Sequence, residues 1–214
     1  MQSESETGQV KSMNIVFDLG GVVVNWRPAE LVRSIVQEPA SQLLMQSGII
    51  GHPDWIALDR GTLTEGDAIE RAVDRTGLPR TQVASLFEAV GPSLTVIPET
   101  VGLMQAAKEA GHRIFVLSNM HAASIAYLED NCNFWELVDG AVISCRIRRV
   151  KPEAEIYEYL LAEYQLNPTE TVFLDDLEDN VRAARSLGIR GIRFVDAVQG
   201  RRELAGLGCI PAPT

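Results

Sequence analysis

Acidic residues follow two apolar runs of this 214-residue chain, at the points where the runs end. Asp18 comes directly after the run 15–17 and before Gly20-Gly21, while Asp175-Asp176 follows the run 171–174. Apolar runs indicate buried strands, and a glycine pair indicates the sharp turn that ends one. Since the carboxyl ends of parallel strands share one edge of a sheet, where ligands bind, we expect the two acidic sites to lie close together.

Two further polar sites are expected at the same edge. Ser118-Asn119 follows the apolar run 113–117, and Lys151 precedes Pro152, which is expected to open a helix at its first position. Each site alone also has an ordinary structural role, because serine and asparagine cap helices, aspartates favour turns and helix N-termini, and a lysine before proline is commonly solvated. Their occurrence together, in this order along one edge, points to a shared chemical task.

That task is predicted to be phosphoryl transfer through an aspartyl-phosphate. A carboxylate such as Asp18 can attack phosphorus once the charge of the phosphate is screened. Asp18 and Asp175-Asp176 offer the oxygen ligands that Mg²⁺ prefers, and the metal lets two anions approach each other. Ser118 and backbone N–H groups at the next helix start can hold phosphate oxygens, while Lys151 supplies a compact positive charge.

The hydrophobic pattern predicts an α/β fold, a doubly wound parallel sheet with an all-helical cap inserted after strand one. Apolar residues from Trp26 to Gly91 recur with helical spacing, and after Pro98 strand and helix patterns alternate. Alternation of this kind is typical of a parallel sheet covered on both faces. The predicted divisions are a mobile tail at 1–12, a core at 13–25 and 92–205, a cap at 26–91 and a C-terminal tail at 206–214.

The composition narrows the classes of partner. With 19 basic and 29 acidic residues the net charge is −10, and no lysine- or arginine-rich block stands out, so nucleic acid and anionic membranes are not expected partners. No apolar segment is long enough to span a bilayer, and the N-terminus lacks the pattern of a secretory signal. Three widely spaced cysteines favour a reducing, cytoplasmic location over a disulfide framework or zinc site. Composition leaves the oligomeric state open.

Four motifs resemble those of the haloacid dehalogenase-like (HAD) hydrolase superfamily: Phe-Asp-Leu-Gly-Gly-Val, Val-Leu-Ser-Asn, Val-Lys-Pro-Glu and Phe-Leu-Asp-Asp-Leu-Glu-Asp-Asn. The likeness covers essentially the whole chain between the tails. The helical insertion resembles members with a helical cap after strand one, among them sugar-1-phosphate phosphatases and the phosphatase domain of soluble epoxide hydrolases. The resemblance implies a HAD-like Rossmannoid core and Mg²⁺-dependent hydrolysis of a small phosphorylated metabolite such as a sugar 1-phosphate.

The resemblance also implies a role for each matching residue. Asp18 would be the nucleophile and a metal ligand, and Lys151 would steady the phosphate. The remaining implied roles are Gly20 as a metal ligand through its carbonyl, Gly21, Ser118 and Asn119 as phosphate-binding residues, Asp176 as a metal ligand with Asp175 beside it, and Asn180 as the residue that orients the metal shell or Lys151.

One position departs from the family pattern. Most phosphatases of the superfamily have a second aspartate two residues after the nucleophile, which is the general acid and base, and here that residue is Gly20. The acid could come from the cap or the substrate, the substrate could have a good leaving group, or the chain could be a weak enzyme. Restoring the acid with Gly20→Asp is expected to accelerate the hydrolysis of poor leaving groups most, since general acid–base catalysis contributes roughly 10²–10⁴-fold.

Two alternatives to a phosphatase stay open at this point. A metal-independent 2-haloacid dehalogenase would also lack the second aspartate, but it would not keep the acidic pair Asp175-Asp176. A catalytically weak interaction module would use the helical block as a docking surface. Candidate substrate contacts in that block are His52, Trp55, Asp59 and Arg60, although Trp55 could equally be core packing and Asp59-Arg60 solvated surface. His112 and His121 have no ligand spacing and are expected to be surface or capping residues.

Overall fold

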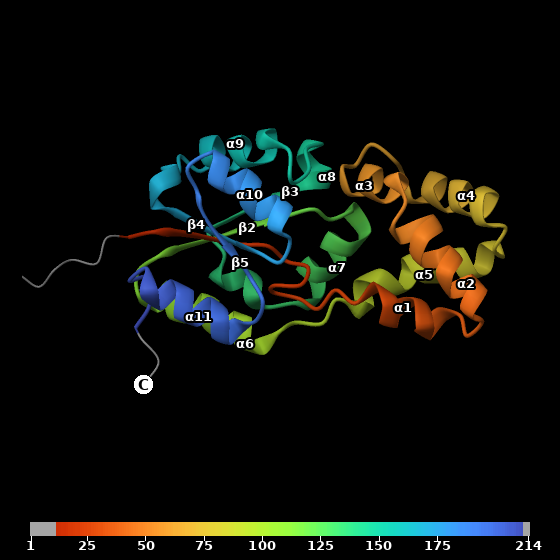
Figure 1. Cartoon of the computed structure of the whole chain (residues 1–214), viewed down its shortest axis with the longest axis horizontal. Coiled ribbons are helices and arrows are strands. Elements are labelled where there is room, and N and C mark those ends of the chain that lie inside the picture. Colours follow the sequence, from red (N-terminus) through yellow and green to blue (C-terminus); the bar gives the residue numbers. More distant parts are fainter. Residues whose placement is uncertain (1–11, 212–214) are drawn as a thin grey trace, which may run out of the picture.

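A computed structural model describes residues 12–211 as a five-stranded sheet in the order β3-β2-β1-β4-β5 (Figure 1). Every neighbouring pair of strands is parallel. The predicted doubly wound parallel sheet is therefore confirmed. The strands are β1 (Asn14–Phe17), β2 (Arg113–Ser118), β3 (Gly140–Ile143), β4 (Thr171–Asp175) and β5 (Arg190–Arg193).

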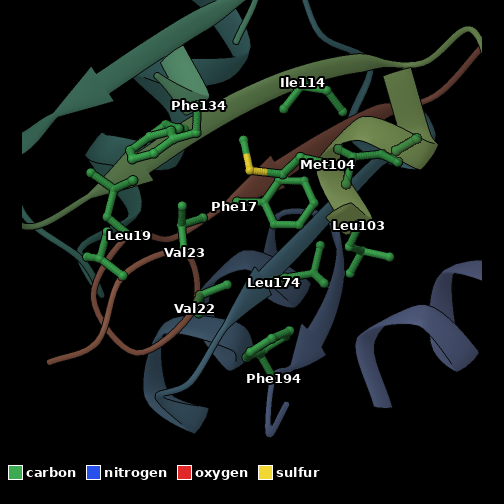
Figure 2. Packing of buried hydrophobic residues seen from close by; sticks show 14 of the residues in the cluster. Phe17, Leu19, Val22, Val23, Leu103, Met104, Ile114, Phe134, Leu174 and Phe194 are labelled. Carbon is green, nitrogen blue, oxygen red and sulfur yellow. The ribbon is translucent and has the colours of Figure 1, made fainter. Parts of the chain in front are cut away.

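Strand β1 lies at the centre of the sheet and is buried on both faces. Its side chains alternate between two apolar clusters, since Phe17 packs in one and Val16 in the other. The Phe17 cluster, shown in Figure 2, includes residues of α6, α7 and α11, whereas the Val16 cluster includes residues of α9 and α10. These helices are α6 (Pro98–Glu109), α7 (Ala122–Asn131), α9 (Ala154–Glu163), α10 (Glu178–Ser186) and α11 (Ala197–Gly206).

Between β1 and α6 the chain is helical and has an apolar cluster of its own. The segments are α1 (Pro28–Ile35), α2 (Pro39–Met45), the π-helix η1 (Gln46–Ile50), α3 (Pro53–Asp59), α4 (Glu65–Thr76) and α5 (Arg80–Ser93). The two chain segments that lead into and out of this block run side by side, because Asn25 donates to the Thr95 carbonyl at 2.8 Å and Ile97 to that of Val23 at 2.9 Å. The division into a cap at 26–91 and a core stays a prediction, with which this separate cluster agrees.

Short helices complete the core: η2 (Phe134–Leu137), α8 (Ser144–Ile147) and η3 (Pro168–Glu170). Helix α9 begins at Ala154, so the prediction that Pro152 opens it was wrong. The backbone N–H and carbonyl of Lys151 are both bound to the Asn119 side chain, which holds this segment outside the helix. No helix within 12–211 is long and apolar enough to cross a membrane.

The structure describes part of the predicted C-terminal tail but almost none of the predicted N-terminal tail. All of the N-terminal tail except Ser12 lies outside the described residues. In the predicted C-terminal tail, Cys209 and Ile210 are buried and pack in the same cluster as Phe17. The chain therefore stays attached to the core beyond the end of α11.

The helical block contacts the core where α3 meets α8 (Figure 1). Gly61 follows α3 with φ +73°, and a Cβ atom at this position would lie 2.5 Å from the carbonyl oxygen of Cys145 in α8. A backbone oxygen cannot move aside as a flexible side chain can, so only glycine permits this approach. The contact fixes the end of α3 relative to the sheet edge.

Gly61→Ala is therefore expected to lower the melting temperature more than Gly77→Ala. Gly77 also has a positive φ (+69°), but a Cβ there meets nothing within 4 Å, so its variant carries the conformational cost alone. The added clash at Gly61 is expected to cost about 1–3 kcal/mol. Thermal unfolding of both variants followed by circular dichroism measures the difference, and equal losses would contradict the close packing of α3 on α8.

Candidate active site

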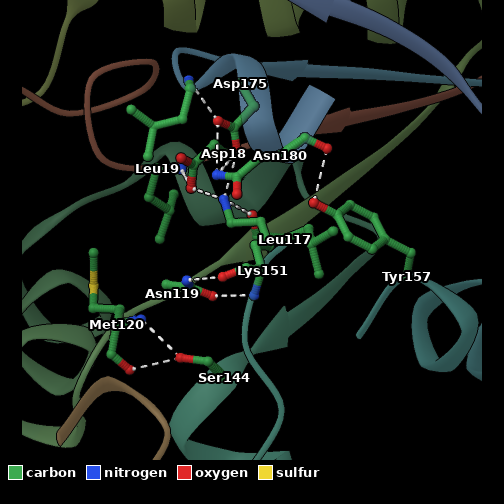
Figure 3. Close-up of polar contacts among 11 residues, drawn as sticks. Asp18, Leu19, Leu117, Asn119, Met120, Ser144, Lys151, Tyr157, Asp175 and Asn180 are labelled. Atoms are coloured by element: carbon green, nitrogen blue, oxygen red, sulfur yellow. Dashed lines mark hydrogen bonds and ion pairs between the residues drawn. The ribbon is translucent and has the colours of Figure 1, made fainter. Parts of the chain in front are cut away.

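A buried lysine joins two carboxylates at the carboxyl edge of the sheet (Figure 3). Lys151 Nζ lies 2.8 Å from Asp18 Oδ1 and 2.7 Å from Asp175 Oδ2, and it donates to the Leu117 carbonyl at 3.0 Å. Asp18 directly follows β1, and Asp175 is the last residue of β4, its neighbour in the sheet. The parallel pairing of β1 and β4 thus brings residues 157 positions apart in sequence to one point.

Burial sets the electrostatics of this cluster. Burial raises the pKa of Asp18 to about 7, against the opposing effect of the Lys151 ammonium. Burial alone would lower the pKa of Lys151, but Asp18 and Asp175 outweigh it and raise that pKa. The pKa of Asp176 is also raised, first by burial and then by the negative charge of Asp175. Crowded carboxyl groups with one ammonium favour a further cation, which would stabilise their ionised forms.

The three aspartates fit a divalent metal ion. Asp18, Asp175 and Asp176 each offer one oxygen, and these atoms lie within 4.8 Å of one another. An all-oxygen set is the kind that Mg²⁺ prefers. Asp175 is firmly held, because its carboxylate accepts from Asn180 Nδ2 at 3.0 Å as well as from Lys151. Asn180 thus contacts Asp175 directly, and its implied role in orienting the metal shell or Lys151 stays a prediction.

Gly21 makes room for Asp176 in this cluster. It has φ +76°, and a Cβ atom there would lie 2.7 Å from Asp176 Oδ2. The Gly20-Gly21 turn therefore lets the carboxylate of Asp176 approach the end of β1. At Gly20 a Cβ would meet only ordinary contacts with Trp26, the nearest at 3.6 Å.

Ser118 and Asn119 differ in how their side chains are engaged. Ser118 ends β2, and its buried Oγ has no hydrogen-bond partner among the described residues. A buried hydroxyl without a partner is costly, so this atom is suited to a bound ligand. Asn119 donates from Nδ2 to the Lys151 carbonyl at 2.9 Å and accepts the Lys151 N–H at 2.8 Å. Its side chain positions Lys151, and its expected contact with phosphate stays a prediction.

A cavity of about 80 Å³ lies between the helical block and this edge. Gly20 and Asn119 line it from the core, and Trp55 and Asp59 line it from α3. Trp55 stacks on Trp26 with ring centroids 5.9 Å apart. The other lining residues are Val90, Leu94, Met120, His121 and Ser124. The wall over the predicted site is therefore largely apolar and aromatic.

Two of the four candidates from the helical block do not line this cavity. The side chain of His52 caps α3 by accepting the Asp54 N–H at 3.1 Å. Arg60 forms a two-pronged ion pair with Glu153, at 2.6 and 2.7 Å, in the segment before α9. These contacts give His52 and Arg60 structural partners, whereas Trp55 and Asp59 face the space above Gly20.

His121 is a cavity residue that the sequence pattern missed. The expectation was that His112 and His121 are surface or capping residues. Both are buried, so neither lies at the surface, and His121 occupies the N-cap position of α7 without a capping hydrogen bond from its side chain. His121 Nε2 lies 2.8 Å from Ser124 Oγ, its Nδ1 has no partner among residues 12–211, and burial lowers its pKa to about 4. Its place three residues after Ser118, in the loop at the sheet edge, is the signal that could have identified it.

Comparison with known proteins finds relatives of this chain that are similar over most of its length. Over 91% of its length the chain is 29% identical to a sesquiterpene phosphatase from Aspergillus oryzae, of which it covers 96%. It is 22% identical to a D-ribitol-5-phosphate phosphatase from Bacteroides thetaiotaomicron, covering 89% of this chain and 96% of that one.

A crystal structure of a HAD family enzyme from Bacteroides thetaiotaomicron, in complex with magnesium and inorganic phosphate, has the same fold. It aligns with TM-score 0.67 and 21% identity, over 85% of this chain and 93% of that one. The family model described as haloacid dehalogenase-like hydrolase matches residues 13–188, which include all four motifs. The chain therefore belongs to the haloacid dehalogenase-like hydrolases, as its motifs predict.

Proposed function

We propose that this protein is a Mg²⁺-dependent phosphatase that hydrolyses a small phosphorylated metabolite through an aspartyl-phosphate on Asp18. The observation that carries the proposal is the contact of one buried lysine with two carboxylates, next to a third, at the edge of the sheet. A bound Mg²⁺ would screen the negative charge between nucleophile and phosphate. The two phosphatases among the relatives support the same reaction class.

The residues of the site divide the work of phosphoryl transfer. Asp18 Oδ1 is held by the Leu19 N–H at 2.7 Å and by Lys151, which directs the carboxylate toward incoming phosphorus. Asp18, Asp176 and the Gly20 carbonyl would hold the metal, with Asp175 beside them. The free Ser118 hydroxyl and the N–H groups of the following loop would hold the phosphate oxygens, and Lys151 would offset their charge.

The cavity favours a leaving alcohol with an apolar face. Two stacked tryptophans, Val90 and Leu94 surround the space where that alcohol would lie. A sugar phosphate would stack one ring face on Trp55, and a sugar-alcohol phosphate, as in the Bacteroides relative, would lay its open carbon chain along the same wall. A terpenoid phosphate, as in the Aspergillus relative, would bury more apolar surface. We therefore propose small phosphate monoesters of both kinds as the substrates to be screened.

The dehalogenase alternative is less well supported. A metal-independent reaction on a carbon–halogen bond has no use for an acidic cluster such as Asp18, Asp175 and Asp176. An interaction module without activity would give no reason for a buried lysine paired with two carboxylates, since buried charges are costly to retain.

Metal dependence and the nucleophile can be tested together. Phosphatase activity against a panel of sugar, sugar-alcohol and prenyl monophosphates is expected with Mg²⁺ and is expected to vanish in excess EDTA, because the carboxylates then repel the phosphate. Asp18→Asn is expected to reduce release of inorganic phosphate to background on every substrate. Full activity in EDTA would contradict the proposed metal-dependent phosphatase. Equal inactivity of wild type and Asp18→Asn on the whole panel would favour the interaction module.

Ser118→Ala separates ligand binding from stability. The hydroxyl has no partner within the part of the chain that the structure describes, so its removal is expected to leave the melting temperature unchanged or slightly higher. The loss of a hydrogen bond to a charged oxygen, about 1.5–3 kcal/mol, is expected to weaken inhibition by inorganic phosphate by roughly 10–100-fold. Ser186→Ala, on the exposed side of α10, is the matched control. Unchanged phosphate inhibition in Ser118→Ala would remove Ser118 from the phosphate site.

A further inference from the structure

The residue that would donate a proton to the leaving group is missing at position 20, yet a carboxyl group lies in the same cavity. Of the described residues that line the cavity, Asp59 is the one with a carboxyl side chain, and Gly20 lines the same space. We propose that Asp59, at the end of α3, is the general acid that protonates the leaving alcohol and the general base that activates the hydrolytic water. The proposal rests on the proposed phosphatase function.

The contacts of Asp59 hold it at a defined place over the sheet edge. Its backbone carbonyl accepts the Ser144 hydroxyl, and that same hydroxyl oxygen accepts the Met120 N–H at 2.9 Å. The backbone N–H of His121 donates to the Asp59 carboxyl group. Two links therefore connect the end of α3 to the loop that follows Ser118, where phosphate is proposed to bind.

The packing of Gly61 on Cys145 adds a third link directly after Asp59. General acid catalysis requires a donor fixed near the oxygen that receives the proton. A buried carboxyl group that accepts one hydrogen bond, on a helix end whose backbone is held at two further points, meets that requirement better than a side chain on a mobile loop.

The protonation of Asp59 suits both roles. Burial raises its pKa to about 7, opposed by the His121 N–H and by Lys151, so both protonation states are available near neutral pH. The facing groups do not supply a competing acid: His121 is neutral because burial lowers its pKa to about 4, and burial raises the pKa of the Cys145 thiol. The ammonium group of Lys151 does not supply a competing acid either, because it is paired with Asp18 and Asp175.

The two steps balance in atoms and charge. In the first, an Asp18 oxygen forms a bond to phosphorus, the bond from phosphorus to the alcohol oxygen breaks, and that oxygen takes the proton of Asp59. In the second, the Asp59 carboxylate takes a proton from water while the water oxygen bonds to phosphorus and the bond to Asp18 breaks. Inorganic phosphate leaves, and Asp59 is protonated again.

If Asp59 only stabilised the fold, its replacement would affect all substrates equally. Substrates with different leaving groups therefore distinguish a structural role from general acid catalysis. The test compares p-nitrophenyl phosphate, whose leaving group needs no proton, with an alkyl phosphate, whose leaving group does. In Asp59→Asn, kcat/KM for the alkyl phosphate is expected to fall roughly 10²–10⁴-fold. For p-nitrophenyl phosphate kcat/KM is expected to change less than about 10-fold, while kcat falls because the second step lacks its base.

A rapid-mixing experiment should then show p-nitrophenolate released in a burst of about one per enzyme molecule, as expected when the second step is slow. Asp74→Asn, the same change at an exposed position of α4, is expected to leave both substrates unaffected. Equal losses of kcat/KM on both substrates, or no loss, would overturn the assignment. A wild type that is inactive on both substrates with Mg²⁺ would instead overturn the proposed phosphatase function.

Gly20→Asp supplies an independent test by restoring an acid at the family position. A Cβ atom at this position meets only ordinary contacts with Trp26. In the Asp59→Asn background it is expected to raise kcat/KM for the alkyl phosphate at least 10-fold. In the wild type, where Asp59 already donates the proton, the gain is still expected to be largest for poor leaving groups but smaller than in Asp59→Asn. The same factor in both backgrounds would show that Asp59 is not the acid.

Discussion

The ion pairs of Lys151 are the constraint on which the rest of the structure depends. A buried ammonium group is tolerated only when it is paired and hydrogen-bonded, and here Asp18, Asp175 and the Leu117 carbonyl satisfy it together. Those three partners come from three adjacent strands, so the register of the sheet has to be correct for the lysine to be buried at all. The contacts of Lys151 and the folding of the sheet therefore impose the same requirement on this edge.

Around this centre, polar side chains hold the charged residues and leave few groups free. Asn119 binds both backbone groups of Lys151, and Asn180 binds the carboxylate of Asp175. Two buried atoms near this centre have no partner among residues 12–211: Ser118 Oγ, at the end of β2, and Nδ1 of His121, which lines the cavity. Charged side chains that are held in place, next to polar atoms that lack a hydrogen-bond partner, are preorganised for a charged ligand.

The core of the site could be predicted from sequence because each strand end is marked locally. Asp18, Ser118 and Asp175-Asp176 all follow apolar runs, and parallel pairing then brings them to one edge. The partner of Arg60 could not be predicted, since it depends on how the helical block packs against the core. The hydrogen bonds of Asn119 with Lys151 depend on how two loops of the core meet, which the strand pattern does not specify. No periodicity in the chain encodes a contact such as that of Arg60 with Glu153, or the burial of Cys209 after the last helix.

The stacked pair Trp26 and Trp55 has an optical consequence. One ring belongs to the segment that leads out of β1 and the other to α3, and both line the cavity. The chain has three tryptophans, so two of its three main fluorophores lie at the place where an ester would bind. A change in intrinsic tryptophan fluorescence should therefore report occupancy of the cavity without any attached label.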